Sequence, residues 1–165
     1  MILIIDVHYH ENGAQAVAGL ISDWNSQQLE KYYTLNISEV AEYTSGQFYK
    51  RELPCILQLL ELINEDFQYI VIDGYVQLGM EQHAGLGAHL WDTLIHKKPI
   101  IGIAKNYYKD TPEDCALYRG NSKKPLYITC KDLTLLDAKY YIATMSGQHR
   151  LPDLIKQVDC LTRIK

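Results

Sequence analysis

Three carboxylates occupy positions in the sequence where a negative charge is costly. Asp6 interrupts an apolar run at the N-terminus, Asp73 closes the run Tyr69–Ile72 directly before a glycine, and Glu52 opens a stretch with apolar residues at helical spacing. A charge inside or at the end of a buried strand requires a partner or a metal ion. Singly, each has an ordinary explanation: a turn or ion pair, a strand end, or a helix N-terminus.

Taken together, these carboxylates are suited to holding a divalent cation. Oxygen-only ligands favour Mg²⁺ or Mn²⁺, which keep several waters and bridge to substrate phosphate. Such a cation activates water and stabilises a leaving oxygen. Lys105 follows the apolar run Ile100–Ala104 and is placed to stabilise transition-state charge, although a lone lysine is most often solvated.

The elements that must position these residues can be read from the hydrophobic pattern. We expect an antiparallel meander of three strands over 2–9, 14–21 and 29–35, with Asn12-Gly13 as the hairpin turn. Strand–helix units should follow, with Pro54 in the first turn of the first helix and Thr134 capping a later one. Their predicted ranges are a helix over 53–63, a strand over 69–73, a helix over 86–95, strands over 100–104 and 126–129, and helices over 135–144 and 153–163.

A three-stranded meander followed by strand–helix units predicts a mixed α/β sheet, antiparallel first and then parallel, with helices on both faces. This order is shared by the ribonuclease-H-like class, and 165 residues fit a single domain over 1–165. If the first and fourth strands are neighbours, Asp6 and Asp73 converge at one edge of the sheet, where ligands of open α/β sheets bind. Glu52 would reach the same edge from its helix.

Other patterns give weaker indications. Asp6, His8 and His10 share one strand face and form an alternative metal site, although the two histidines flank a turn and should be exposed. Gly85–His89 lacks the full spacing of a phosphate loop, so its glycines are expected to permit close packing. Lys123-Lys124 either contacts a phosphate backbone or is a solvated loop.

Composition indicates a cytoplasmic protein without a membrane segment. Four scattered cysteines lack the spacing of structural zinc and are expected to be reduced thiols. The apolar N-terminus is too short for a signal peptide, and no apolar run reaches the length of a membrane helix. A net charge of −4 means that any contact with nucleic acid needs a local basic patch or a bound cation.

Several motifs, in order along nearly the whole chain, resemble those of the endonuclease V family. The stretch from Tyr43 to Pro54 is similar to its Tyr-Ile-Pro-Gly…Arg-Glu-x-Pro motif, and Pro99–Lys105 resembles Pro-Thr-Ile-Gly-Val-Ala-Lys. Four further segments match family motifs: Asp6-Val7-x-Tyr9, Ile70–Gly74, Gly85–Leu90 and His149–Asp153.

The resemblance implies a ribonuclease-H-like fold and a Mg²⁺- or Mn²⁺-dependent endonuclease that cuts a phosphodiester near inosine in DNA or RNA, in repair or processing of nucleic acid. Asp6, Glu52 and Asp73 fall at the family's metal-binding carboxylates, and Lys105 at its active-site lysine. Tyr43 falls at the wedge tyrosine beside the lesion. Substrate-binding positions implied in this way are Tyr43, Gly46, Gly74 and His89. An inosine-like base would be turned into a pocket and read at its edge.

The chain also departs from the family pattern. Thr44-Ser45 replaces Ile-Pro after the wedge tyrosine, Met80-Glu81-Gln82 stands where the family has His-Pro-Arg, and the later Gly-His motif is missing near Cys130–Asp132. Asp132 and Asp137 are considered as substitute outer ligands. The departures leave open an alternative, a nucleic-acid-binding relative with weak or no catalysis. A small-molecule α/β enzyme remains a third hypothesis, resting on fold analogy alone.

Overall fold

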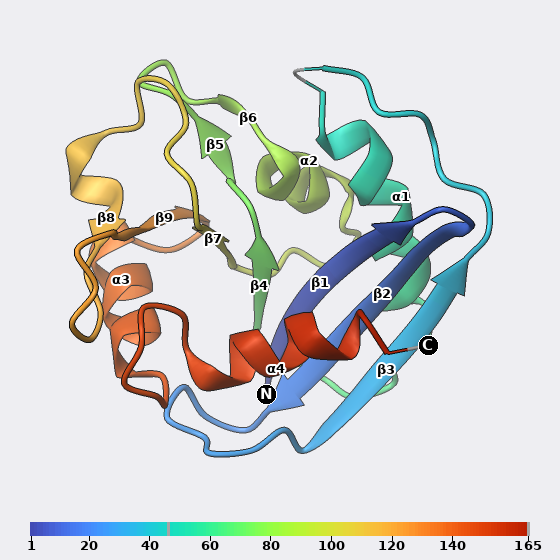
Figure 1. Cartoon of the computed structure of the whole chain (residues 1–165), viewed down its shortest axis with the longest axis horizontal. Coiled ribbons are helices and arrows are strands. Elements are labelled where there is room, and N and C mark those ends of the chain that lie inside the picture. Colours follow the sequence, from blue (N-terminus) through green and yellow to red (C-terminus); the bar gives the residue numbers. More distant parts are fainter. Residues whose placement is uncertain (46, 165) are drawn as a thin grey trace.

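A computed structural model describes residues 1–45 and 47–164 as a seven-stranded mixed sheet with two helices on each face (Figure 1). The strand order is β3-β2-β1-β4-β7-β9-β8. The longer strands are β1 (Ile2–His10), β2 (Gly13–Ile21), β3 (Lys31–Ile37), β4 (Tyr69–Asp73), β7 (Ile100–Ala104) and β9 (Leu126–Lys131). The short elements are β8 (Ala116–Leu117), the separate hairpin β5 (Gln77–Leu78) and β6 (His83–Ala84), and a 3₁₀ turn (Glu113–Cys115).

The sheet confirms the predicted meander and the two central parallel strands. β1, β2 and β3 pair antiparallel, and β1, β4 and β7 run parallel. The expectation that only parallel strands follow the meander is wrong at the far edge, because β9 is antiparallel to β7 and β8 is antiparallel to β9. The hairpin turn lies one residue earlier than predicted: His10 pairs with Gly13, so Glu11 and Asn12 form the turn.

The helices cover the two faces as separate pairs. Leu3, Ile5 and Ile72 pack on the face covered by α1 (Tyr49–Leu60) and α2 (Leu86–Thr93). Alternate strand residues such as Ile4 and Val71 pack on the face covered by α3 (Leu135–Thr144) and α4 (Asp153–Leu161). This period-two alternation fixes the face on which each polar strand residue lies.

Two helix starts illustrate the local signals. Thr134 caps α3 as predicted, with its Oγ1 accepting a hydrogen bond from the Asp137 backbone N at 3.1 Å. α1 begins about one turn before the predicted start, so Pro54 lies in its second turn. Since Pro lacks an N–H, the bond it forgoes is the one to Lys50 near the helix start, where the loss costs little. No helix among the described residues is long and apolar enough to cross a bilayer.

Candidate active site

The first parallel strand pair brings Asp6 and Asp73 together. β1 and β4 remain paired up to Ile5 and Ile72, so Asp6 and Asp73 are the next residues in register, where the strands part. Residues two apart on a strand point to the same face of the sheet. Asp6 therefore shares the face of Ile4, and Asp73 that of Val71, which is the face covered by α4. Together with Lys105 and Asp159 they line a small hollow between the sheet and α4.

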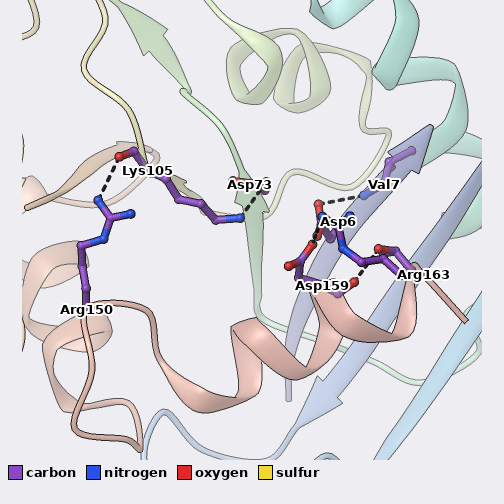
Figure 2. Close-up of polar contacts among 8 residues, drawn as sticks. Asp6, Val7, Asp73, Lys105, Arg150, Asp159 and Arg163 are labelled. Carbon is purple, nitrogen blue, oxygen red and sulfur yellow. Dashed lines mark hydrogen bonds and ion pairs between the residues drawn. The ribbon is translucent and has the colours of Figure 1, made fainter. Parts of the chain in front are cut away.

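Lys105 continues β7 and lies beside Asp73. Its Nζ is 3.6 Å from Asp73 Oδ2, forming an ion pair in which both side chains are about one-third exposed (Figure 2). Burial raises the pKa of Asp73, while the Lys105 ammonium acts in the opposite direction. The predicted neighbourhood of Asp6, Asp73 and Lys105 is therefore present in the fold.

Asp6 is a buried carboxyl with a strongly raised pKa. Only 8% of the residue is exposed, and the Val7 backbone N donates to its Oδ1 at 2.9 Å. Burial, then the charge of Asp73 and a hydrogen bond with Asp159, raise the pKa of Asp6 to about 8. A carboxyl with this pKa retains its proton near neutral pH when no cation is present.

Asp159 on α4 is a functional candidate that the sequence reasoning missed. A hydrogen bond joins its carboxylate to Asp6 (Figure 2). Partial burial acts to raise the pKa of Asp159, but the bond from Asp6 and the charges of Lys105 and Arg163 lower it. The available signal was its spacing: Asp159 lies four residues after the buried Ile155, a carboxylate beside the apolar stripe of the helix.

Glu52 approaches from the other side of the sheet. It lies in the first turn of α1 and is 3% exposed. Burial, followed by the charges of Asp6 and Asp73, raises its pKa well above the usual range, with Arg51 opposing. The Arg51 guanidinium lies 3.5 Å from the centroid of the Tyr9 ring and so packs the start of α1 against β1. Glu52 thus lies within electrostatic reach of the two aspartates.

These four carboxylates suit a hard divalent cation by their chemistry and their excess negative charge. Burial and repulsion between the carboxylates raise the pKa values of three of them. A bound cation would offset this repulsion and favour the ionised carboxylates. Over residues 1–45 and 47–164, however, no three Asp, Glu, His or Cys side chains already form a group arranged to hold a metal ion. If a metal ion binds here, the side chains of Asp6, Glu52, Asp73 and Asp159 would have to move closer together to hold it.

A pocket of about 500 Å³ adjoins this cluster at the ends of β4 and β7. Asp73 and Lys105 belong to its lining, and aromatic side chains form its walls: Tyr43, Phe48, Tyr49 and Tyr75. Tyr43 is 59% exposed at the rim, and Gly74 lines the pocket without a side chain. Gly46, the remaining predicted residue of this segment, lies outside the described residues.

His89 and the glycines before it have structural partners. The His89 ring stacks on Tyr49, with the ring centroids 3.7 Å apart, so it supports a pocket wall without lining the pocket. The first N–H groups of α2 bind carbonyls: Gly87 N donates to Tyr75 O at 3.2 Å and Ala88 N to Val76 O at 3.2 Å. A Cβ on Gly87 would lie 2.5 Å from Val76 Cγ2. Close packing therefore accounts for this segment.

The side chains of Tyr75 and Arg150 form hydrogen bonds with the backbone around Lys105. Tyr75 Oη donates to Asn106 O at 2.6 Å and accepts from Tyr108 N at 3.1 Å. From the other side, Arg150 Nη1 donates to Lys105 O at 3.0 Å (Figure 2). Neither contact was anticipated, because each joins loops distant in sequence.

The remaining sequence candidates lie away from the cluster. Asp132 follows β9, whose Lys131 pairs with Ile100 at the start of β7, whereas Asp73 pairs with Ile103 near its end. Asp132 is thus at the opposite end of the sheet and is not an outer ligand in this geometry. Asp137 occupies the first turn of α3, the helix that follows. His8 and His10 follow Asp6 on the same face of β1, but they line a different hollow, a groove beyond the end of α4.

The family model and the similar proteins of known sequence point to the same family. The model of the endonuclease V family matches residues 1–121. An endonuclease V of Pyrococcus horikoshii is 28% identical over 160 residues, covering 96% of this chain and 71% of that protein. An endonuclease V of Bacillus subtilis is 27% identical, covering 82% of this chain and 66% of its own length.

Solved structures with a similar fold include members of the same family. An endonuclease V of Ciona intestinalis, solved in complex with a 23-mer DNA containing an inosine followed by a ribo-adenosine, has a TM-score of 0.80 to this chain. The identity is 18%, and the match covers 98% of this chain and 83% of that one. At this identity the likeness shows the fold, which is the expected ribonuclease-H-like one.

Proposed function

Because this chain belongs to the endonuclease V family, we propose that it is a metal-dependent endonuclease that hydrolyses a phosphodiester near inosine in DNA or RNA. The observation that carries the proposal is the convergence of Asp6, Asp73 and Asp159 with Lys105, next to an aromatic-walled pocket. Carboxylates with excess charge at the end of parallel strands suit phosphoryl chemistry better than any other use of this edge.

Each side chain has a definite task in this proposal. Mg²⁺ or Mn²⁺ held by Asp6, Glu52, Asp73 and Asp159 would supply an activated water and neutralise phosphate charge. The Lys105 ammonium, beside Asp73, stabilises negative charge that develops on the phosphate oxygens. Asp159, whose pKa is lowered by the hydrogen bond from Asp6 and by the charges of Lys105 and Arg163, stays ionised and is available as a ligand.

The adjoining pocket is suited to holding a base that has left the stack. Tyr43, Phe48 and Tyr49 offer aromatic faces, and Gly74 leaves room for close approach to the backbone. Inosine is the base we assign to it, in keeping with the inosine-containing DNA bound by the Ciona intestinalis relative. Deaminated bases pair weakly and so cost less to extrude.

Cleavage of matched oligonucleotides tests the proposal. Wild type should cut DNA or RNA containing one inosine with Mg²⁺ or Mn²⁺, and leave the guanosine-containing control intact. Asp73→Asn should reduce the rate at least about a hundredfold, because it removes a charge from the metal site. Asp132→Asn, the same change at the opposite end of the sheet, should cut at the wild-type rate. Absence of any cation-dependent cut by wild type would contradict the proposal.

A second candidate function is binding of inosine-containing nucleic acid without turnover. The turn between β5 and β6 favours it, since Met80-Glu81-Gln82 stands where the family has His-Pro-Arg, which removes an arginine and adds an acidic residue. Fluorescence anisotropy would then detect inosine-selective binding that weakens with salt, while no product forms with either cation. Product formation decides for the first candidate.

A further inference from the structure

A groove of about 740 Å³ lies on the α4 face of the sheet, beyond the C-terminal end of α4. Its lining includes His8, Gln15, Tyr32, Thr34, Asn36 and Arg163. The groove exists because α4 ends at Leu161, whose carbonyl accepts a hydrogen bond from Gln15 Nε2 at 3.0 Å. Past that point, the face of β1, β2 and β3 has no helix over it (Figure 1).

The groove lies next to the candidate active site. His8 follows Asp6 by two residues on the same strand face, about 7 Å away. Arg163, at the rim of the groove, places Nη2 3.2 Å from Asp159 Oδ1. The base-sized pocket lies on the other side of the cluster, since Asp73 and Lys105 belong to its lining. The carboxylate cluster therefore lies between the pocket, with which it shares Asp73 and Lys105, and the groove, which begins two residues along β1.

The groove carries groups that contact bases and sugars. His8, Gln15 and Asn36 are neighbours across the three strands, in the register His8–Gln15–Asn36. Tyr32 is 50% exposed and offers an aromatic face. Among the described residues of the lining, Glu11 carries a carboxylate and Arg163 a guanidinium. An open antiparallel face with aromatic, imidazole and amide side chains is the kind of surface on which single-stranded nucleic acid stacks.

We propose that this groove binds the single-stranded nucleotides on one side of the cleaved bond, and the inference rests on the proposed nuclease function. A strand with its scissile phosphate at the carboxylates and one base in the pocket would leave the cluster along the groove. β1 extends about 13 Å from Asp6 to His10, room for up to about four nucleotides at about 3.4 Å each.

Oligonucleotides of graded length test the proposal. Two series, as DNA and as RNA, carry one inosine and are extended by one to six nucleotides on the 3′ side only or the 5′ side only. In wild type, one series should gain affinity with each added nucleotide up to about four, measured as Kd by anisotropy without metal and as KM in cleavage. Tyr32→Ala should remove at least about fivefold of that gain, because a stacked base is lost.

Matched variants separate the groove from general effects. Tyr32→Phe should restore the gain, Asn36→Ala should reduce it, and Tyr140→Ala, an exposed tyrosine on α3, should leave it unchanged. No length dependence, or a gain that survives Tyr32→Ala and Asn36→Ala, overturns the proposal. So does a shift in oligomeric state on Tyr32→Ala, which would make the face an interface between copies. Length-dependent binding without cleavage would support the groove and reject the nuclease function.

Discussion

Asp6 combines three constraints at a single position. Its register on β1 places it beside Asp73, its burial withholds water, and its bond to Asp159 needs a proton. In the proposed function a cation would replace that proton and stabilise the ionised carboxylate. Under that proposal, metal binding at Asp6 and folding stability are coupled.

Stability of the metal-free protein should fall as the pH rises. The folded pKa of Asp6, about 8, exceeds its ordinary value of 3.8, so the folded state holds the proton more tightly than the unfolded state. The stabilisation is complete below about pH 4 and is lost as the pH rises towards 8. Between pH 6 and pH 8.5, urea unfolding should show a loss of more than about 1 kcal/mol.

Two controls assign this loss to the cluster. Asp6→Asn cannot ionise, so its free energy of unfolding should vary much less with pH over the same range. Mg²⁺ should stabilise wild type more at pH 8.5 than at pH 6, because it competes with the proton. A wild-type stability that rises between these pH values would refute the role given to Asp6.

At the scale of elements, the loop between α3 and α4 is held by one side chain. Arg119 is 7% exposed, and its guanidinium donates to His149 O at 2.6 Å, Met145 O at 2.7 Å, and more weakly to Arg150 O and Gly147 O. That loop carries Arg150, which in turn holds the Lys105 carbonyl. Arg119 therefore fixes the loop, and through Arg150 the loop helps to fix the backbone of Lys105.

Replacing Arg119 should therefore affect both stability and rate. Arg119→Leu leaves buried carbonyls without donors and should lower the free energy of unfolding by at least about 3 kcal/mol. Arg119→Lys should recover little, because an ammonium cannot span carbonyls arranged for a planar fork. The cleavage rate, measured at a temperature where both variants are folded, should also fall. Equal stability of Arg119→Leu and wild type would show that the clamp is unimportant.

Comparing the strands with the sequence shows which of their features the hydrophobic pattern predicted. The apolar runs of β4 and β7 predicted their buried, central position, and the spacing of Asp6 and Asp73 within such runs predicted their meeting. Pattern carries no strand direction, so the antiparallel β9 was not predicted. Two-residue strands such as β8 are too short for any periodicity. Asp159 and Arg150 act through contacts over long sequence separations, which local patterns do not contain.

At the scale of the whole molecule, a net charge of −4 opposes a polyanionic substrate. Glu81 adds to this opposition from the turn between β5 and β6, where it pairs with the exposed His83 at 3.0 Å. Leu78 in that hairpin and Gly85 directly after it both line the pocket. Local charge at this turn should therefore influence affinity more than the same charge elsewhere.

Glu81→Arg should raise affinity for inosine-containing duplex DNA and steepen its dependence on salt, because a phosphate contact releases a counterion. We expect the slope of log K against log salt to change by about one unit. Glu61→Arg makes the same charge change at the far end of α1 and should have a much smaller effect. Equal effects of the two substitutions would mean that net charge, rather than the hairpin, sets the affinity.

The parting of β1 from β4 after Ile5 and Ile72 has a consequence for how this chain can vary. Asp6 is held in register with Val17 by the hairpin that joins His10 to Gly13, so insertion or deletion of one residue between Asp6 and His10 would shift the alternation of the first strand by one step. Asp6 would then point towards α1, and an apolar neighbour would stand over α4 in its place. Single-residue insertions or deletions in this part of β1 should consequently be far less tolerated than substitutions there, even when every amino acid introduced is apolar.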